Sequence, residues 1–134
     1  RAQCCGWKDM QLLNVGIWGQ DTSRCFDSRG GRNSFLSDSG RIVVPVSSVD
    51  SLMKDKLCTF IKMDVEGAER EALLGARWTL QTQKPKLAFS GYHRNEDLFA
   101  LPLLLKEIEP SYRIYFRHHP YLPAWESNFY ATAD

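Results

Sequence analysis

The residues best placed to do chemistry lie in the run Phe60 to Glu69, where two acids, Asp64 and Glu66, follow an apolar strand. A glycine, Gly67, comes next, and an amphipathic helix is expected after it. Ligands of open α/β sheets bind at the carboxyl ends of the strands, so this spacing places both carboxylates at a candidate site. There they could stabilise a developing charge or take a proton from a hydroxyl group.

Each of these residues also has a structural interpretation. Asp64 could orient a bound molecule, or it could cap the helix that follows. Glu66 could act as a base, or it could interact favourably with the positive end of the helix dipole. Gly67 lets the chain pass from strand to helix close to a ligand. Glu69 is expected to be a solvent-exposed helix residue.

Histidines supply a third candidate group. His93 follows a predicted strand that ends near Gly91, so it reaches the same edge of the sheet and could deprotonate an acceptor. A loop histidine bonded to the backbone is the alternative. His118 and His119 end a later strand, but their spacing does not match the short spacings typical of metal sites. No metal is therefore expected.

The elements that must position these residues alternate between strand and helix, which predicts an α/β fold. A strand, a long helix and a second strand imply a parallel crossover, and the last strand is expected to run antiparallel to its neighbours. Pro45 suggests an edge strand, and Pro102 suggests the first turn of a helix. Strands are predicted at Met10–Trp18, Thr22–Phe26, Ile42–Val46, Leu57–Val65, Lys86–Gly91, Tyr112–His118 and Ser127–Thr132, and helices at Glu66–Gln83 and Pro102–Glu109.

Composition limits the classes of function. The 134 residues suffice for one domain, and a net charge of +1 gives no electrostatic reason to expect binding to nucleic acid or to an anionic membrane. No apolar run approaches the length of a membrane span. The four cysteines, without a Cys-x-x-Cys pair, are read as free thiols in a reducing cytoplasm. Because the chain starts at Arg1 within what reads as a folded segment, it is expected to be a fragment.

Several segments together carry a resemblance to one known family. They are Ile61–Glu69 with Leu73–Ala76, Val15–Trp18, Val49–Leu52, Pro102–Lys106, Tyr112–His119 and Phe129–Ala131. In this order, which covers nearly the whole chain, they resemble the FkbM-type methyltransferases.

The resemblance implies a single domain over residues 1–134, the C-terminal part of a Rossmann-like fold whose cofactor is S-adenosylmethionine. The acceptor would be a hydroxyl group on a sugar or small natural product. Asp64, Glu66 and His93 are the predicted catalytic residues, and Gly16, Asp64 and Val65 the predicted cofactor contacts. The family's Gly-rich cofactor loop and the acid of its second strand have no counterpart in these residues. The chain alone is therefore expected to bind S-adenosylmethionine weakly or not at all.

Two other functions stay open: a non-catalytic remnant that serves as an interaction module, and a metal-dependent hydrolase that uses Asp64, Glu66 and the histidines.

The resemblance also implies a strand order. In the family, with strands numbered along the chain, the sheet order is 3-2-1-4-5-7-6. Without the first two strands, the strand Leu57–Val65 would have an unpaired apolar edge, which favours aggregation. Either the strand Met10–Trp18 pairs with that edge, or a second copy of the chain covers it in a homo-oligomer.

Overall fold

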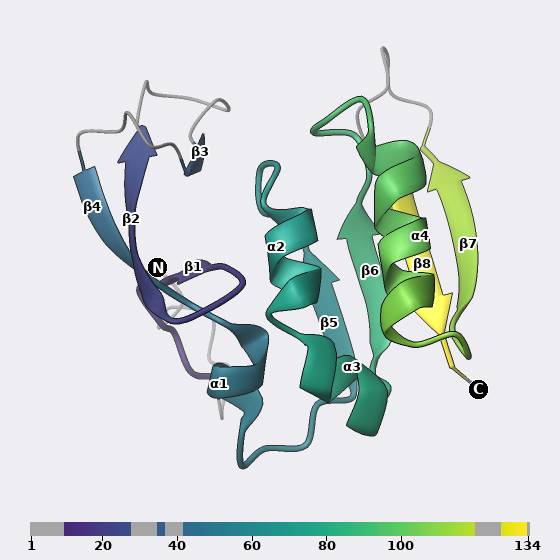
Figure 1. Ribbon diagram of the computed structural model, residues 1–134, viewed down its shortest axis with the longest axis horizontal. Helices are drawn as coiled ribbons and strands as arrows, with labels where there is room; N and C mark the ends of the chain where they lie inside the picture. Colours follow the sequence, from purple (N-terminus) through teal and green to yellow (C-terminus); the bar gives the residue numbers. More distant parts are fainter. Residues whose placement is uncertain (1–9, 28–34, 37–41, 120–126, 134) are drawn as a thin grey trace.

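The computed structural model describes residues 10–27, 35–36, 42–119 and 127–133 of the chain (Figure 1). These residues form two four-stranded sheets, and α2, α3 and α4 all lie on one face of the C-terminal sheet. The fold is mixed α/β, as predicted. Only the pairs β1–β4 and β5–β6 are parallel, so the expected mostly parallel sheet is seen only in part.

The N-terminal sheet has the order β1-β4-β2-β3. Its strands are β1 (Gly16–Ile17), β2 (Thr22–Asp27), β3 (Phe35–Leu36) and β4 (Ile42–Ser47). The strand with Pro45 is thus an inner strand rather than the predicted edge. The proline is tolerated because the pairing of β4 with β1 involves only Val46 and Ser47, beyond the proline.

The strand predicted at Met10–Trp18 is reduced to β1, and it does not pair with β5. Trp18 instead donates its backbone N–H to the carbonyl of Ser47 at 3.0 Å, which extends the pairing with β4. The same segment packs against the helical layer, where a Cβ built on Gly75 would lie 2.3 Å from the Trp18 carbonyl oxygen. The segment thus lies beside β4 and the junction of α2 and α3 instead of pairing with β5.

The C-terminal sheet has the order β5-β6-β8-β7, which confirms the predicted order of the fourth, fifth, seventh and sixth strands. β8 runs antiparallel to both of its neighbours, also as predicted. In the described residues β5 pairs only with β6, so the first of the two alternatives, cover by the strand Met10–Trp18, is wrong. Cover of that edge by a second copy of the chain stays a prediction. The strands are β5 (Phe60–Met63), β6 (Lys86–Ser90), β7 (Arg113–His118) and β8 (Ser127–Thr132).

The long helix predicted after β5 is two short helices, α2 (Glu69–Leu74) and α3 (Arg77–Thr82). Asp50, in α1 (Val49–Met53), explains the break. Its carboxylate accepts hydrogen bonds from the backbone N–H groups of Trp78 and Thr79, both at 2.9 Å, so it caps α3 from outside. Its own N–H donates to the carbonyl of Gly75 at 2.8 Å.

The last helix, α4, runs from Asp97 to Ile108 and contains Pro102 in its interior, so the predicted start at Pro102 is wrong. The helix starts earlier because the Asp97 carboxylate accepts the N–H of Arg94 at 3.0 Å and the carbonyl of Glu96 accepts the N–H of Ala100 at 2.8 Å. The core lies between these helices and the C-terminal sheet. Its largest members are Leu73, Leu80, Leu87, Phe89, Leu101, Leu105, Ile108 and Tyr112.

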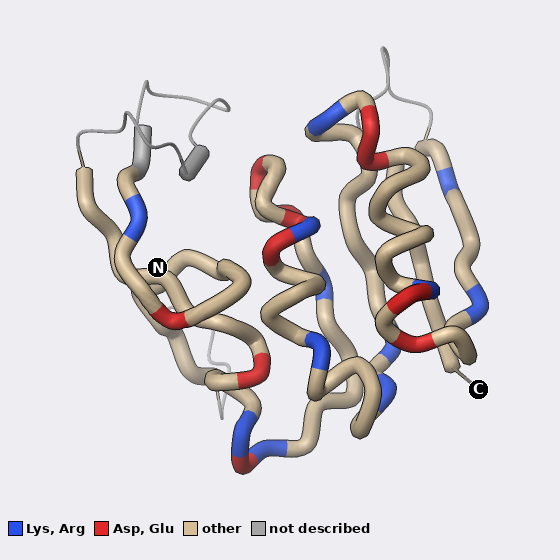
Figure 2. The backbone as a smooth tube through the Cα atoms, in the orientation of Figure 1, with Lys and Arg blue, Asp and Glu red and all other residues tan. Residues whose placement is uncertain are grey.

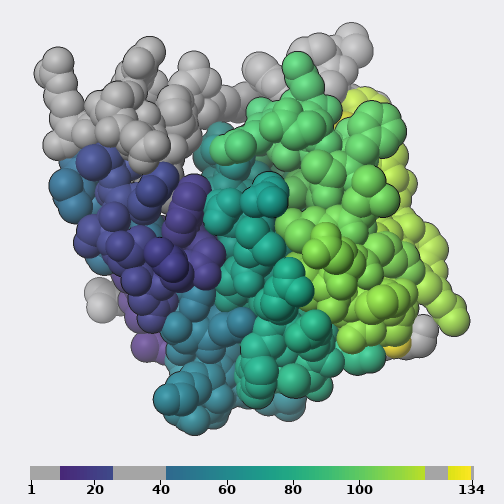
Figure 3. Space-filling model, viewed as in Figure 1, coloured from purple at the N-terminus to yellow at the C-terminus, as the bar shows by residue number. Residues whose placement is uncertain are grey.

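The N-terminal elements pack alongside α2 in the space-filling view (Figure 3). Cys25 and Cys58 are free thiols, as predicted, whereas Cys4 and Cys5 lie outside the described residues. None of the helices in the described parts of the chain has the length and apolar character needed to cross a membrane.

Candidate functional site

The loop between β5 and α2 turns the chain sharply at the carboxyl edge of the sheet. Glu66 has a φ of 52° and Gly67 a φ of 90°, both in the left-handed region. Glycine adopts that region freely, whereas glutamate does so at a cost, and such residues concentrate at functional sites. The turn presents the carboxylates of Asp64 and Glu66 to solvent, with 42% and 48% of their side chains exposed.

His93 lies against these two carboxylates. Its Nε2 is 3.5 Å from Oδ1 of Asp64 and 3.5 Å from Oε2 of Glu66. The structure therefore brings together the three residues that the sequence predicted to be catalytic, two from the end of β5 and one from beyond β6. Acidic segments gather at this end of α2 and in the loop before it (Figure 2).

Glu69, the first residue of α2, contacts the other side of the imidazole ring. Its Oε1 is 2.7 Å from Nδ1 of His93 and accepts the backbone N–H of Val65 at 3.1 Å. The residue has no exposed surface, so the prediction of a solvent-exposed Glu69 is wrong. The sequence contained a signal that could have corrected it, because Glu69 heads the buried stripe of Leu73, Ala76 and Leu80 at helical spacing.

The environment of His93 shifts its proton affinity. Burial of the ring works to lower the pKa of His93, but the hydrogen bond with Glu69 and the charges of Glu69, Glu66 and Asp64 outweigh burial. The net result is a pKa raised above the ordinary value of 6.5. The ring is mostly buried, with 12% of the side chain exposed, and its Nε2 faces the acidic edge, by which we mean the carboxylates of Asp64 and Glu66.

Asp64 has further partners on the neighbouring strand. Its Oδ1 accepts hydrogen bonds from the hydroxyl of Ser90 at 2.8 Å and from that of Tyr92 at 3.2 Å. The N-cap of α2 is Ala68, so Asp64 does not have the alternative capping role. In the described residues neither Asp64 nor Glu66 forms an ion pair with a lysine or arginine.

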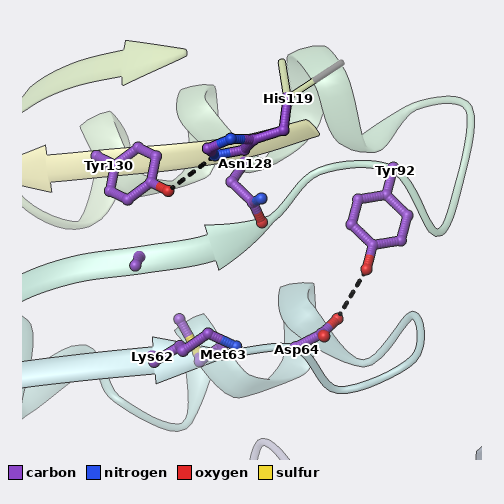
Figure 4. A pocket seen from close by; sticks show the side chains of 8 residues that line it. Lys62, Met63, Asp64, Tyr92, His119, Asn128 and Tyr130 are labelled. Carbon is purple, nitrogen blue, oxygen red and sulfur yellow. Dashed lines mark hydrogen bonds between the residues drawn. The ribbon is translucent and has the colours of Figure 1, made fainter. Parts of the chain in front are cut away.

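A pocket of about 160 Å³ adjoins Asp64 at the carboxyl edge of the sheet (Figure 4). Tyr92 and Asp64 meet at one end of it, and His119 and Tyr130 meet at the other, with Nε2 of His119 3.5 Å from the Tyr130 hydroxyl. The pocket is lined by Lys62, Met63, Asp64, Ala88, Tyr92, His119, Asn128 and Tyr130. The sequence indicated no role for Lys62, Tyr92, Asn128 or Tyr130, because strand pairing and the loop after β6 bring them together.

The predicted cofactor contacts are not all at this edge. Val65 lies beside Asp64 and is tied to Glu69 by its N–H, whereas Gly16 is in β1 of the N-terminal sheet, paired with Val46. The structure thus places Asp64 and Val65 together without bringing Gly16 to them.

A metal ion could in principle use this cluster, because ligand atoms of Asp64, Glu69 and His93 lie within 4.8 Å of one another. Nδ1 of His93 and Oε1 of Glu69 are, however, already at hydrogen-bonding distance from each other. The geometry is that of a carboxylate–imidazole pair. His118 is not part of the cluster, since its Nδ1 is 2.9 Å from the hydroxyl oxygen of Ser127.

Comparisons with known proteins show what the whole chain is similar to. A sequence profile described as the methyltransferase FkbM domain matches residues 10–122. The crystal structure of methyltransferase FkbM from Methylobacillus flagellatus KT is similar, with a TM-score of 0.71 and 32% sequence identity. That match covers 90% of this chain but 28% of the other, so this chain spans less than a third of that relative. No curated protein matches the chain significantly.

Proposed function

This chain belongs to the FkbM methyltransferase family, and we propose that it forms the acceptor-activating edge of an S-adenosylmethionine-dependent O-methyltransferase. The acceptor in this proposal is a hydroxyl group of a sugar or small natural product. One observation carries the proposal: Nε2 of His93 faces the carboxylates of Asp64 and Glu66 at the end of β5.

The chemistry needed from these residues is removal of a proton from a weakly acidic hydroxyl. An imidazole nitrogen can accept that proton, and the nearby carboxylates stabilise the imidazolium that results. His93 then holds the proton at Nε2 while the acceptor oxygen reacts. Asp64, bonded to Ser90 and Tyr92, is fixed in place and can orient the acceptor.

The residues at this edge suit a positively charged cofactor. S-adenosylmethionine supplies a methyl group on a positively charged sulfur when it is bound. Two exposed carboxylates, without a lysine or arginine paired to either in the described residues, form an anionic edge that attracts such a charge.

We place the acceptor in the pocket beside Asp64. The tyrosines Tyr92 and Tyr130 offer ring surface and hydroxyl groups, and Asn128 and Lys62 offer polar groups, which suits a molecule with several hydroxyls. Because Asp64 lines the pocket and also lies 3.5 Å from Nε2 of His93, an acceptor there can reach the base.

The test measures transfer of a radiolabelled methyl group from S-adenosylmethionine by the full-length gene product. Sugars, polyketide alcohols, amines and carboxylic acids are supplied as acceptors. We expect label on hydroxyl compounds. His93→Gln should lower the rate by about 100-fold or more, the usual contribution of a general base. Asp64→Asn, nearly identical in shape, should lower the rate while preserving the fold.

His118→Gln is the matched control, because this histidine is on β7 and contacts Ser127 instead of the acidic edge. Its rate should equal that of the wild type. Label transferred only to amines or carboxylic acids would overturn the choice of acceptor. A full-length protein that transfers no label would overturn the proposed activity, and unchanged transfer by His93→Gln would remove His93 from its role.

A further inference from the structure

A fully buried carboxylate at the start of α2 is unusual enough to need an explanation. Glu69 has no exposed surface, and its Oε2 has no hydrogen-bond partner within the described residues. Burying a carboxylate is costly unless it is paired and hydrogen-bonded. A neutral residue at this position of the stripe would pack against the core more favourably, so stability alone does not account for a glutamate.

The bonds of its other oxygen indicate what the glutamate does. Oε1 accepts the N–H of Val65 and lies 2.7 Å from Nδ1 of His93. A carboxylate can only accept hydrogen bonds, so Nδ1 carries the hydrogen in this contact. The neutral imidazole then has its lone pair on Nε2, the nitrogen that faces Asp64 and Glu66.

We propose that Glu69 is a positioning residue, which fixes the orientation and the Nδ1–H tautomer of His93 so that Nε2 can accept the proton of the acceptor. This inference rests on the proposed function, because it concerns the same histidine. Oε1 of Glu69 also accepts the N–H of Val65, and this hydrogen bond connects the His93 ring to the segment that carries Asp64. One buried side chain thereby sets the relative placement of base and acidic edge.

Charged groups around the ring come from several elements. Asp64 and Glu66 face it from the end of β5, and Glu69 faces it from α2. Asp97, at the start of α4, is 3% exposed and interacts electrostatically with Glu69 and Arg94. The Tyr92 ring lies 4.4 Å from the imidazole ring, centroid to centroid.

The experiment compares wild-type protein with Glu69→Gln and records ¹⁵N-edited NMR spectra of the imidazole as a function of pH. The amide of glutamine has the same shape and its oxygen can still accept from Val65, so the fold should be kept. We expect neutral His93 in the wild type to be the Nδ1–H tautomer. In Glu69→Gln the pKa of His93 should fall, because one carboxylate charge is lost and burial remains.

Glu71→Gln is the matched control, since Glu71 is on the same helix but pairs with Arg70 at 3.2 Å instead of His93. It should leave the tautomer and pKa unchanged. In methyl transfer by full-length Glu69→Gln, kcat should be lower by about 10- to 100-fold, with little change in KM. This loss is smaller than the loss expected when the base itself is removed. The pH profile of this variant should shift with the pKa of His93.

Neutral His93 observed as the Nε2–H tautomer in the wild type would overturn the proposal, even if no variant folds. So would a pKa of His93 that Glu69→Gln leaves unchanged. These readouts do not depend on activity. A protein with the expected tautomer that transfers no methyl group would contradict the proposed function alone, and an active enzyme with the wrong tautomer would contradict this inference alone.

Discussion

Glu66 has a left-handed backbone conformation, and at this residue the effect on the stability of the protein can be separated from the effect on its function. Glu66, at a φ of 52°, places its carboxylate 3.5 Å from Nε2 of His93. For a residue with a side chain this conformation costs about 1–2 kcal/mol. The strain is tolerable if the carboxylate is needed at the acidic edge. A substitution of Glu66 should therefore change stability and methyl transfer in opposite directions.

Glu66→Gly should raise the free energy of unfolding by about 0.5–1 kcal/mol, because relief of the left-handed conformation exceeds the entropy that glycine adds to the unfolded chain. Methyl transfer by the full-length protein should fall, because the carboxylate is gone. Denaturant unfolding and the labelled-methyl assay give the two values. Lys84→Gly is the control, since Lys84 has a φ of 48° but lies far along the chain at the end of α3.

For Lys84→Gly we expect a smaller gain in stability, reduced by loss of its partly exposed pair with Glu109 at 3.4 Å, and no change in methyl transfer. If Glu66→Gly kept the wild-type rate, Glu66 would have no part in the site, and its conformation would need another explanation.

At the scale of elements, the junction between α2 and α3 determines how the N-terminal segment sits. Gly75 lies so close to the Trp18 carbonyl oxygen that a Cβ would approach it to 2.3 Å, and that oxygen is backbone, which cannot move aside cheaply. Asp50 caps α3 beside the same junction. The N-terminal sheet is therefore attached to the helical layer through contacts that tolerate little added volume.

Gly75→Ala should lower the free energy of unfolding by about 2–3 kcal/mol, as overpacking does elsewhere, although alanine is the better helix former. Gly19→Ala is the matched control, because its Cβ would meet the end of a flexible side chain, Oε2 of Glu71, at 3.0 Å. It should cost less than about 1 kcal/mol, within the usual range for surface substitutions and small adjustments. Equal losses in thermal or denaturant unfolding would show that the close approach at Gly75 is not what limits this junction.

Much of the element order was predictable because strands β6, β7 and β8 have clear patterns and turn residues around them. The breaks in the helices were less predictable, because they depend on contacts distant in sequence. Asp50 caps a helix 28 residues away, and nothing near Gly75 in the sequence reveals Trp18. The burial of Glu69 could have been predicted from its place in the helical stripe with Leu73, but its partner His93, 24 residues along the chain, could not.

At the scale of the whole molecule, the core is unevenly shared between the two sheets. The buried cluster is built from β5, β6, β8 and the helices, and includes Phe89 and Phe129, whose rings are stacked 5.3 Å apart. Among the strand residues of the N-terminal sheet whose side chains are described, only Val46 is buried. Regions with few buried apolar contacts open more readily.

Hydrogen exchange of the 134-residue chain should therefore show a gradient. Amides of β6 and β8 should exchange only through global unfolding, while those of β2 and β4 should exchange through smaller openings, faster by at least about tenfold. The outer edge of β5 should exchange faster than its β6-facing amides, unless a second copy of the chain covers it. Uniform protection across both sheets would contradict this account of the core.

The candidate site was predictable in part because strand ends and their acids are visible in sequence, and the three predicted catalytic residues do meet. Their exact arrangement was not, because it depends on the tertiary contact between α2 and the loop after β6. The pocket beside Asp64 was not predictable either, since its residues come from β5, β6, β8 and the residues that follow β6 and β7.

The central claim is that Nε2 of His93 takes the proton from the acceptor hydroxyl. The most direct measurement is the pH dependence of single-turnover methyl transfer by the full-length protein. A base must be unprotonated to act, so the rate should rise with pH through the His93 pKa, which lies above 6.5, and then level off. The midpoint should equal the pKa found by NMR and disappear in His93→Gln. A midpoint that persists in His93→Gln, or a rate that does not vary through the His93 pKa, would contradict the claim.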